Sequence, residues 1–188
     1  MKYKINEIFY SIQAEGYNAG KPAVFIRLSG CNLKCPWCDT KYHNKGKEYT
    51  KEELEKEVEK LTQGNKEIMI VFTGGEPTLQ LKNDEELLKG YYRTIETNGL
   101  LPVPNWINWV TCSPKTDIQF TDIPNEIKVV YEEKRKEYFI KLLRYPTLLF
   151  MQPLEEDGIM NPEKAIEFIK RYPKYRLSLQ YHKLIGVR

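Results

Sequence analysis

Three of the chain's four cysteines lie within eight residues, in the spacing C-x₃-C-x₂-C formed by Cys31, Cys35 and Cys38. Three thiolates on one loop can hold three corners of a 4Fe–4S cube, which leaves the fourth iron open to a small-molecule ligand. A structural zinc site needs four protein ligands instead, and His43 is close enough in sequence to supply the fourth. The spacing favours a cluster, with zinc as the alternative. Cys112 stands apart; we expect it to end a buried strand as a small apolar residue, with a fourth cluster ligand as the alternative.

A second group of residues suited to chemistry is the segment TGGEP at 73–77, which follows an apolar run at 68–72. Paired glycines let a backbone approach a ligand closely, because a Cβ would block that approach. Glu76 offers an acceptor for an ammonium group. On its own, the segment fits an ordinary turn between a strand and a helix equally well. Together with the cysteine loop it predicts a ligand site.

Polar residues of this kind follow the ends of several predicted strands. Apolar runs rich in β-branched and aromatic residues predict strands at 23–28, 68–72, 93–97, 106–112, 127–131, 147–151 and 176–180. Helices are predicted after a capping box at Thr50–Glu53, at 83–89, at 134–143, and from an N-cap at Asn161 with Pro162 first in the helix to Arg171. A chain of 188 residues is too short for an eight-unit barrel of ~250 residues. We therefore expect an α/β fold, a partial, open parallel β/α barrel with its ligand site at the carboxyl ends of the strands.

Composition limits the other functions. The chain has 29 Lys and Arg against 26 Asp and Glu, a net charge of +3 with no basic stripe, so no nucleic-acid partner is expected. Hydrophobic residues make up 41% of the chain, which excludes a disordered protein. No apolar run nears the ~20 residues of a membrane span, and the first residues lack the apolar core of a signal peptide. We expect a single cytoplasmic domain over residues 1–188, with no membrane partner.

The cysteine spacing, Trp37 before the last cysteine and the TGGEP segment together resemble the radical S-adenosylmethionine (radical SAM) superfamily. The resemblance implies a shortened open barrel of the radical SAM type that carries a 4Fe–4S cluster on the three cysteines. In that superfamily the amino and carboxylate groups of S-adenosylmethionine chelate the open iron. An electron from the reduced cluster then cleaves the sulfonium and gives a 5′-deoxyadenosyl radical. Beyond the cluster and this cofactor, no catalytic residue is predicted.

Segments along the whole chain resemble the 7-carboxy-7-deazaguanine synthase family of queuosine and 7-deazapurine biosynthesis. They are residues 5–16, 25–31, 38–40, 96–99, 112–115, 152–153 and 180–183. The resemblance implies a lyase that converts 6-carboxy-5,6,7,8-tetrahydropterin to 7-carboxy-7-deazaguanine and ammonia by radical ring contraction. It also implies Mg²⁺ bound by Thr40, whose hydroxyl is a hard oxygen ligand, and an electron donor such as flavodoxin. Small size and apolar helix faces predict a homodimer.

The same resemblance implies site residues. Its S-adenosylmethionine contacts fall on Trp37, Cys38, Asp39, Gly75, Glu76, Ser113, Pro114, Lys115, Gln152, Pro153, Leu154 and Glu155. Its substrate contacts fall on Ile12, Gln13, Ala14, Glu15, Arg27, Thr73, His182 and the terminal carboxylate of Arg188. Gln13 and Glu15 would read the amide-like edge of the pterin, and Arg27 would clamp its carboxylate with two hydrogen bonds.

Three features depart from the family's pattern. Ala14 stands where the family commonly has glycine, residues 80–94 leave little room for a helix, and Glu155 takes the place of an expected Asp. These departures predict local differences in the turn after Gln13, in the cofactor contacts and in the barrel wall. The runner-up enzyme class is a glycyl-radical activase, which applies the same radical to a partner protein and has no need of polar residues converging on a small molecule.

Overall fold

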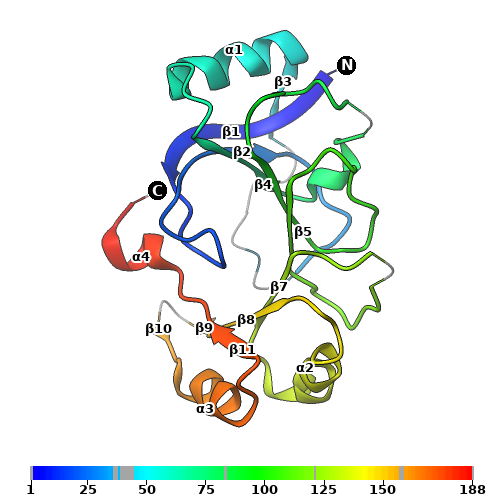
Figure 1. Cartoon of the computed structure of the whole chain (residues 1–188), viewed down its shortest axis with the longest axis vertical. Coiled ribbons are helices and arrows are strands. Elements are labelled where there is room, and N and C mark those ends of the chain that lie inside the picture. The colour runs from blue at the N-terminus through cyan, green and yellow to red at the C-terminus, as the bar shows by residue number, and fades with distance from the viewer. Residues whose placement is uncertain are drawn as a thin grey trace.

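The computed structural model describes residues 2–35, 38, 45–82, 84–120, 122–156 and 159–187, and its main feature is one curved sheet (Figure 1). The strands of this sheet are β1 Lys2–Ile12, β2 Pro22–Leu28, β3 Lys47–Thr50, β4 Met69–Gly74, β5 Arg93–Thr97, β6 Trp109–Cys112, β7 Glu126–Val130, β8 Leu148–Gln152 and β11 Tyr175–Leu177. Their spatial order is β11-β8-β7-β6-β5-β4-β2-β1-β3. A separate ribbon pairs β9 Glu155–Glu156 with β10 Ile159–Met160.

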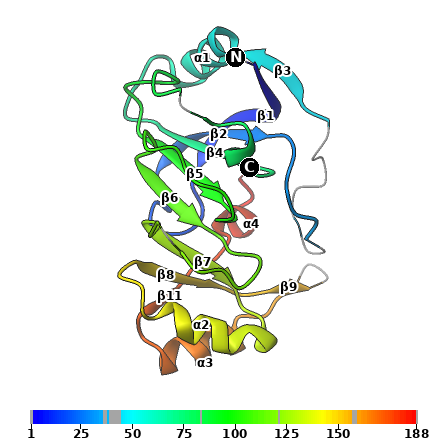
Figure 2. The ribbon, with the colours of Figure 1, turned by 90° about the vertical axis from the view of Figure 1, so that its right-hand side faces the viewer.

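The sheet is parallel from β2 to β11, whereas β1 pairs antiparallel with both β2 and β3. Its two edges, β3 and β11, lie at opposite ends of the molecule, so the barrel is open (Figure 2). This confirms the predicted partial parallel barrel. The strands β1 and β3 are absent from the prediction. At the start of β1, Tyr3 and Ile5 are buried between exposed lysines, a period of two that is a strand signal.

Helices cover the outside of the sheet at both ends of the barrel, namely α1 Lys51–Thr62, α2 Lys136–Leu142 and α3 Glu163–Arg171. The predicted capping box is present at the start of α1, where the Thr50 hydroxyl accepts from the Glu53 N–H and the Glu53 carboxylate accepts from the Thr50 N–H. Leu54 and Val58 then pack α1 on the outer apolar face of the sheet. α2 and α3 close a second apolar cluster with β7, β8 and β11. No helix in the described part of the chain is long and apolar enough to span a bilayer.

Turns take the place of regular structure in the segments before β5 and before β6. The predicted helix at 83–89 is wrong over its described residues 84–89, because they form turns in which Leu88 has a φ of 53°, a conformation that no α-helix continues through. Trp106 is predicted in a strand, but it lies in the turn before β6. Its ring meets Phe72 edge-on at 5.9 Å, and its Nε1 donates to the Lys82 carbonyl at 2.8 Å.

Two predicted boundaries near the C-terminus are wrong. Pro162 is the N-cap of α3 and the helix begins at Glu163, so Asn161 lies one residue too early to cap its first free N–H groups. The last strand is predicted at 176–180, but β11 ends at Leu177 and the chain then turns inward to α4, Tyr181–Ile185. His182 therefore lies on a short helix.

Candidate active site

Strand register places polar side chains next to one another inside the barrel. Arg27 pairs with Thr73 across β2 and β4. Glu96 pairs with Thr111 across β5 and β6, and Thr111 pairs with Glu126 across β6 and β7. Residues in register on neighbouring strands point to the same face, and the residues beside them along each strand point to the other. The inner face therefore carries a polar layer, while the apolar neighbours face the outer core.

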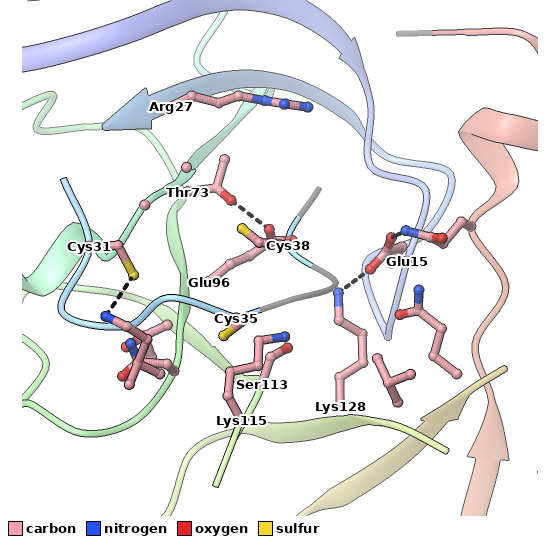
Figure 3. A pocket seen from close by; sticks show the side chains of 18 of the residues that line it. Glu15, Arg27, Cys31, Cys35, Cys38, Thr73, Glu96, Ser113, Lys115 and Lys128 are labelled. Carbon is pink, nitrogen blue, oxygen red and sulfur yellow. Dashed lines mark hydrogen bonds and ion pairs between the residues drawn. The ribbon is translucent and has the colours of Figure 1, made fainter. Parts of the chain in front are cut away.

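One cavity of about 490 Å³ opens at the carboxyl ends of these strands, as the α/β architecture predicts. Figure 3 shows the labelled side chains of its lining, with Cys38 beside Glu96 in the middle, Arg27 above them and Cys35 next to Ser113 and Lys115 below. The predicted site residues that line it are Glu15, Arg27, Cys31, Cys35, Cys38, Thr73, Gly75, Ser113, Lys115, Gln152 and His182. The structure thus brings the proposed cluster ligands and the proposed substrate contacts to a single space.

Other predicted site residues lie elsewhere. Ile12, Gln13 and Ala14 line an adjoining pocket that shares Glu15, Arg27, Thr73 and His182 with the cavity. The cavity lining does not include Glu76, Pro114, Pro153, Leu154 or Glu155. Trp37, Asp39, Thr40, His43 and Arg188 lie outside the described residues.

The glycine pair after β4 is required by a close approach between two loops. A Cβ at Gly75 would lie 1.9 Å from the Gly30 carbonyl oxygen, and one at Gly74, where φ is 107°, would lie 2.5 Å from the Leu28 carbonyl oxygen. The N–H of Gly75 donates to Leu28 at 2.9 Å, and the N–H of Glu76 donates to Gly30 at 2.8 Å. The expectation that a ligand alone explains the glycines is therefore incomplete. They also dock this turn against the start of the cysteine loop.

Glu76 lies in the turn that follows β4. Its carboxylate is fully buried and accepts hydrogen bonds from the N–H and hydroxyl of Thr78, the hydroxyl of Thr97 and the N–H of Asn98. The residues that line the cavity do not include Glu76, so its predicted contact with an ammonium group stays a prediction. The carboxylate ties the turn after β4 to the end of β5. The Asn98 amide extends this link, donating to the Asn32 side chain in the cysteine loop at 2.7 Å.

The three loop thiols suit a cluster. All three are free thiols that line the cavity and are partly exposed. A 4Fe–4S cube uses a separate iron for each cysteine, so three thiols on one loop fit three of its corners. Burial raises the pKa of Cys35, Lys115 opposes that rise, and the charges of Cys38 and Cys31 add to it. Lys115 supplies a cation beside ligands that bind as anions.

A buried ion pair crosses the inside of the barrel from β7 to the loop after β1. Lys128, whose side chain is 9% exposed, bonds one carboxylate oxygen of Glu15, and the Gln180 amide donates to the other at 3.0 Å. Burial acts to raise the pKa of Glu15, but Lys128 and Gln180 bring it below the ordinary value. Burial acts to lower the pKa of Lys128, and the charges of Glu15, Glu96 and Glu126 raise it well above the ordinary value. Both groups are therefore ionised at neutral pH.

Lys128, Glu96 and Gln180 line the cavity and are missing from the predicted site. The sequence of β7 could have indicated that Lys128 belongs to the site. Glu126 and Lys128 alternate with apolar residues in a strand that is almost entirely buried. Ionised side chains are rarely buried without a partner. Charges at every second position of a central strand therefore indicate a polar barrel interior.

Gln13 closes the turn in which Ala14 replaces the family's usual glycine. Its side-chain oxygen accepts from the N–H of Ala14 at 2.9 Å and of Glu15 at 3.2 Å. Its amide nitrogen donates to Glu96 at 3.2 Å, and the Thr73 hydroxyl donates to the same carboxylate at 2.8 Å. In this structure Gln13 therefore orients Glu15 and Glu96.

Arg27 and His182 line both the cavity and the adjoining pocket. The Arg27 guanidinium lies over the Phe9 ring at 5.3 Å, and its Nε is 3.6 Å from a Glu7 carboxylate oxygen. It thus has a surface ion pair and a place in the cavity lining at once. His182 lines the cavity from α4, next to Lys183, which pairs with Glu155 at 2.6 Å. The predicted contact Glu155 reaches the cavity rim through that lysine.

The fold and the site define a radical SAM protein. Residues 25–110 match the family model described as the radical SAM superfamily. This segment holds the cysteine loop, the glycine turn and strands β4 to β5. This class implies a 4Fe–4S cluster and S-adenosylmethionine as the cofactors of the chain.

Similar proteins identify the family within the radical SAM class. The chain is 45% identical to a protein of Bacteroides thetaiotaomicron named 7-carboxy-7-deazaguanine synthase, over 100% of both chains. A protein of the same name from Haemophilus influenzae is 35% identical, over 98% of this chain and 94% of its own. The crystal structure of QueE from Escherichia coli superposes with a TM-score of 0.77 and 31% identity, over 96% of this chain and 94% of that one. This chain belongs to the 7-carboxy-7-deazaguanine synthase family.

Proposed function

We propose that this chain is a radical SAM lyase that converts 6-carboxy-5,6,7,8-tetrahydropterin to 7-carboxy-7-deazaguanine and ammonia, a step of queuosine and 7-deazapurine biosynthesis. The observation that carries the proposal is the single cavity that holds three thiols of one loop together with Glu15 and Arg27. The relatives that match the chain along its length carry the name of this activity. The two products together contain the atoms of the substrate, so the reaction needs no net oxidant.

The cysteine side of the cavity would bind the cofactors. Cys31, Cys35 and Cys38 would hold the cluster. The proposed contacts with S-adenosylmethionine are Trp37, Cys38, Asp39, Gly75, Glu76, Ser113, Pro114, Lys115 and residues 152–155. When bound, the cluster and S-adenosylmethionine supply a radical that takes a hydrogen atom from carbon 6 of the pterin and returns one after ring contraction. The chain's own contribution is to enclose this chemistry and to place Lys115 beside the thiolates.

The opposite side would bind the pterin. Glu15 is ionised and accepts hydrogen bonds, which suits the adjacent amino and ring N–H groups of the pterin edge. The Arg27 guanidinium matches a carboxylate in shape and charge. Thr73 and His182 line the space between them. The terminal carboxylate of Arg188 is a further proposed contact.

The remaining family features belong to the same proposal. Thr40 would be the protein ligand of Mg²⁺, with substrate oxygens and water completing the hard-oxygen shell that this ion prefers. An external one-electron donor such as flavodoxin would reduce the cluster. The chain would act as a single domain over residues 1–188, as a homodimer in the cytoplasm and without nucleic acid.

An anaerobic assay tests the proposal. The protein is reconstituted with iron and sulfide and supplied with reductant, S-adenosylmethionine, Mg²⁺ and 6-carboxytetrahydropterin, and 7-carboxy-7-deazaguanine is measured by mass spectrometry. The product should form with wild type and be lost with Cys35→Ala. Cys112→Ala is the matched control, because Cys112 is buried outside the loop and its loss should leave turnover in place. Cleavage of S-adenosylmethionine without product would contradict the proposal.

A further inference from the structure

A lysine is unusual in the middle of a parallel strand, because parallel strands are buried on both faces. Lys128 lies in β7 between Ile127 and Val129, which are both buried, and its own side chain is 9% exposed. It contacts Glu15, a residue 113 positions away in the sequence. The proposed cofactor and substrate contacts include Glu15 but give Lys128 no role.

We propose that Lys128 is a positioning residue for substrate recognition: its charge holds Glu15 as an ionised acceptor, oriented for two neighbouring N–H donors on the ligand. This inference rests on the proposed function, because Glu15 faces the pterin only if the pterin binds in this cavity. It adds the residue that gives Glu15 its charge and direction.

The hydrogen bonds around Glu15 leave room for a ligand. One carboxylate oxygen accepts from Lys128 and the other accepts from the Gln180 amide at 3.0 Å. A carboxylate has about four lone-pair sites on its two oxygens. Each oxygen of Glu15 thus keeps a site for a further donor, and the carboxylate lies in the cavity lining (Figure 3). A ligand with two adjacent N–H groups matches that pair of sites.

The charge of Lys128 is needed because Glu15 is almost withdrawn from water, with 15% of its side chain exposed. A buried carboxyl group without a cation becomes protonated, and it then donates from one oxygen and no longer accepts at both. The other ionisable side chains that face this carboxylate are His182 on α4 and Lys115 after β6. Lys128 is the one that bonds it, and Glu96 and Glu126 hold Lys128 in its charged form.

The arrangement predicts selectivity for one chemical edge. A ring that carries an amino group beside its ring N–H offers two donors to Glu15. A ring with a carbonyl in place of the amino group turns an oxygen toward the ionised carboxylate, which is repulsive. The ion pair therefore selects a 2-amino ring over its 2-oxo counterpart.

The test measures binding and not turnover. Reconstituted protein with S-adenosylmethionine and no reductant is titrated calorimetrically with 6-carboxypterin and with 6-carboxylumazine, which differ only in the 2-amino and 2-oxo groups. Wild type should prefer 6-carboxypterin. Lys128→Met should weaken 6-carboxypterin by about tenfold to a hundredfold, the range for a hydrogen bond to a charged group. Its affinity for 6-carboxylumazine should stay within about threefold of wild type, and Lys128→Arg should restore most of the preference.

A pH series separates a charge effect from a packing effect. In Lys128→Met burial raises the pKa of the isolated Glu15, so this carboxyl should ionise only as the pH rises, and 6-carboxypterin should bind more tightly at higher pH. Wild type should show no such change. Lys51→Met is the matched control, because it removes a half-buried ion pair with Asp84 at 2.6 Å on the outside of the barrel. It should leave both affinities unchanged.

Four results would overturn the inference. Equal losses for both probes in Lys128→Met, without pH dependence, would make the lysine a packing residue, and no loss would remove its role altogether. If the Lys128 variants do not fold, Glu15→Gln in the otherwise native chain should abolish the preference for 6-carboxypterin. A Glu15→Gln variant that keeps this preference would also overturn the inference. A wild type that prefers 6-carboxypterin yet makes no 7-carboxy-7-deazaguanine contradicts the proposed function and supports this inference. A wild type with no preference overturns the inference whatever its turnover.

Discussion

The carbonyl oxygen of Gly30 occupies the space that a side chain on Gly75 would need, since a Cβ there would lie 1.9 Å away. The turn after β4 therefore fixes the start of the cysteine loop after β2. Gly75→Ala should push the two loops apart and lower the iron bound per chain after reconstitution, with a stability loss of about 1–3 kcal/mol, the usual range for overpacking.

Gly90→Ala is the control for that substitution. Gly90 has a φ of 91° and nothing within 4 Å of an added Cβ. It should lose about 1 kcal/mol from backbone strain and keep its full iron content. Equal iron content in both variants would contradict the role given to Gly75.

Glu76 gives a second prediction, on stability. Its carboxylate accepts from donors of Thr78, Thr97 and Asn98. Glu76→Gln replaces one acceptor oxygen by an NH₂ group that faces donors, so the free energy of unfolding should fall by about 1.5–3 kcal/mol. Urea denaturation measures this loss. Glu59→Gln, on the exposed side of α1, should stay within about 0.5 kcal/mol of wild type, and a similar result for Glu76→Gln would refute the assignment.

Arg135 gives a third prediction, on cofactor affinity. Its Nη1 donates to the Pro114 carbonyl at 3.2 Å and its Nε bonds Asp117 at 3.1 Å, so it holds the loop that presents Ser113 and Lys115 to the cavity. Arg135→Lys replaces the planar guanidinium, which bonds both partners at once, by a single ammonium group. The dissociation constant of S-adenosylmethionine should therefore rise by about tenfold. Asp117→Asn changes only the exposed partner and should have little effect. Unchanged affinity for S-adenosylmethionine in Arg135→Lys would show that Arg135 is not needed to position the loop.

A pH prediction concerns Asp84. Burial acts to raise the pKa of Asp84, and hydrogen bonds from Lys51 at 2.6 Å and Tyr3 at 3.0 Å bring it below the ordinary value. A lowered folded-state pKa means that this stabilisation is present above the unfolded-state pKa of about 4 and is lost as the pH falls through the folded value. Asp84→Asn should therefore be about 1 kcal/mol less stable than wild type at neutral pH. In denaturation series at falling pH that difference should vanish, and a constant difference would contradict the shift.

The fold follows from the sequence where strands are buried on both faces. The predicted runs 68–72 and 147–151 are found at β4 and β8, because continuous apolar stretches have few alternatives. The predicted helix at 83–89 fails because the apolar residues there are buried in turns, and local pattern does not reveal a positive φ at Leu88. The strand β1 is missed because only one of its faces is buried at the start.

The site follows from the sequence where residue type and spacing combine. The cysteine loop and the strand-end residues Thr73, Ser113 and Lys115 meet in one cavity, as parallel strands require. The role of Glu76 does not follow, because its partners Thr97 and Asn98 come from another strand and only the folded chain brings them close. The pairing of Lys128 with Glu15 is not predicted for the same reason, since Glu15 lies on the loop after β1.

One measurement addresses the central claim most directly. In a single anaerobic reaction with excess 6-carboxytetrahydropterin, 7-carboxy-7-deazaguanine and S-adenosylmethionine are quantified together over many turnovers. The account predicts that product accumulates well beyond the amount of enzyme while the S-adenosylmethionine concentration stays constant, because the hydrogen atom is returned. Steady loss of S-adenosylmethionine with no 7-carboxy-7-deazaguanine would contradict it and leave a radical SAM enzyme that acts on another substrate.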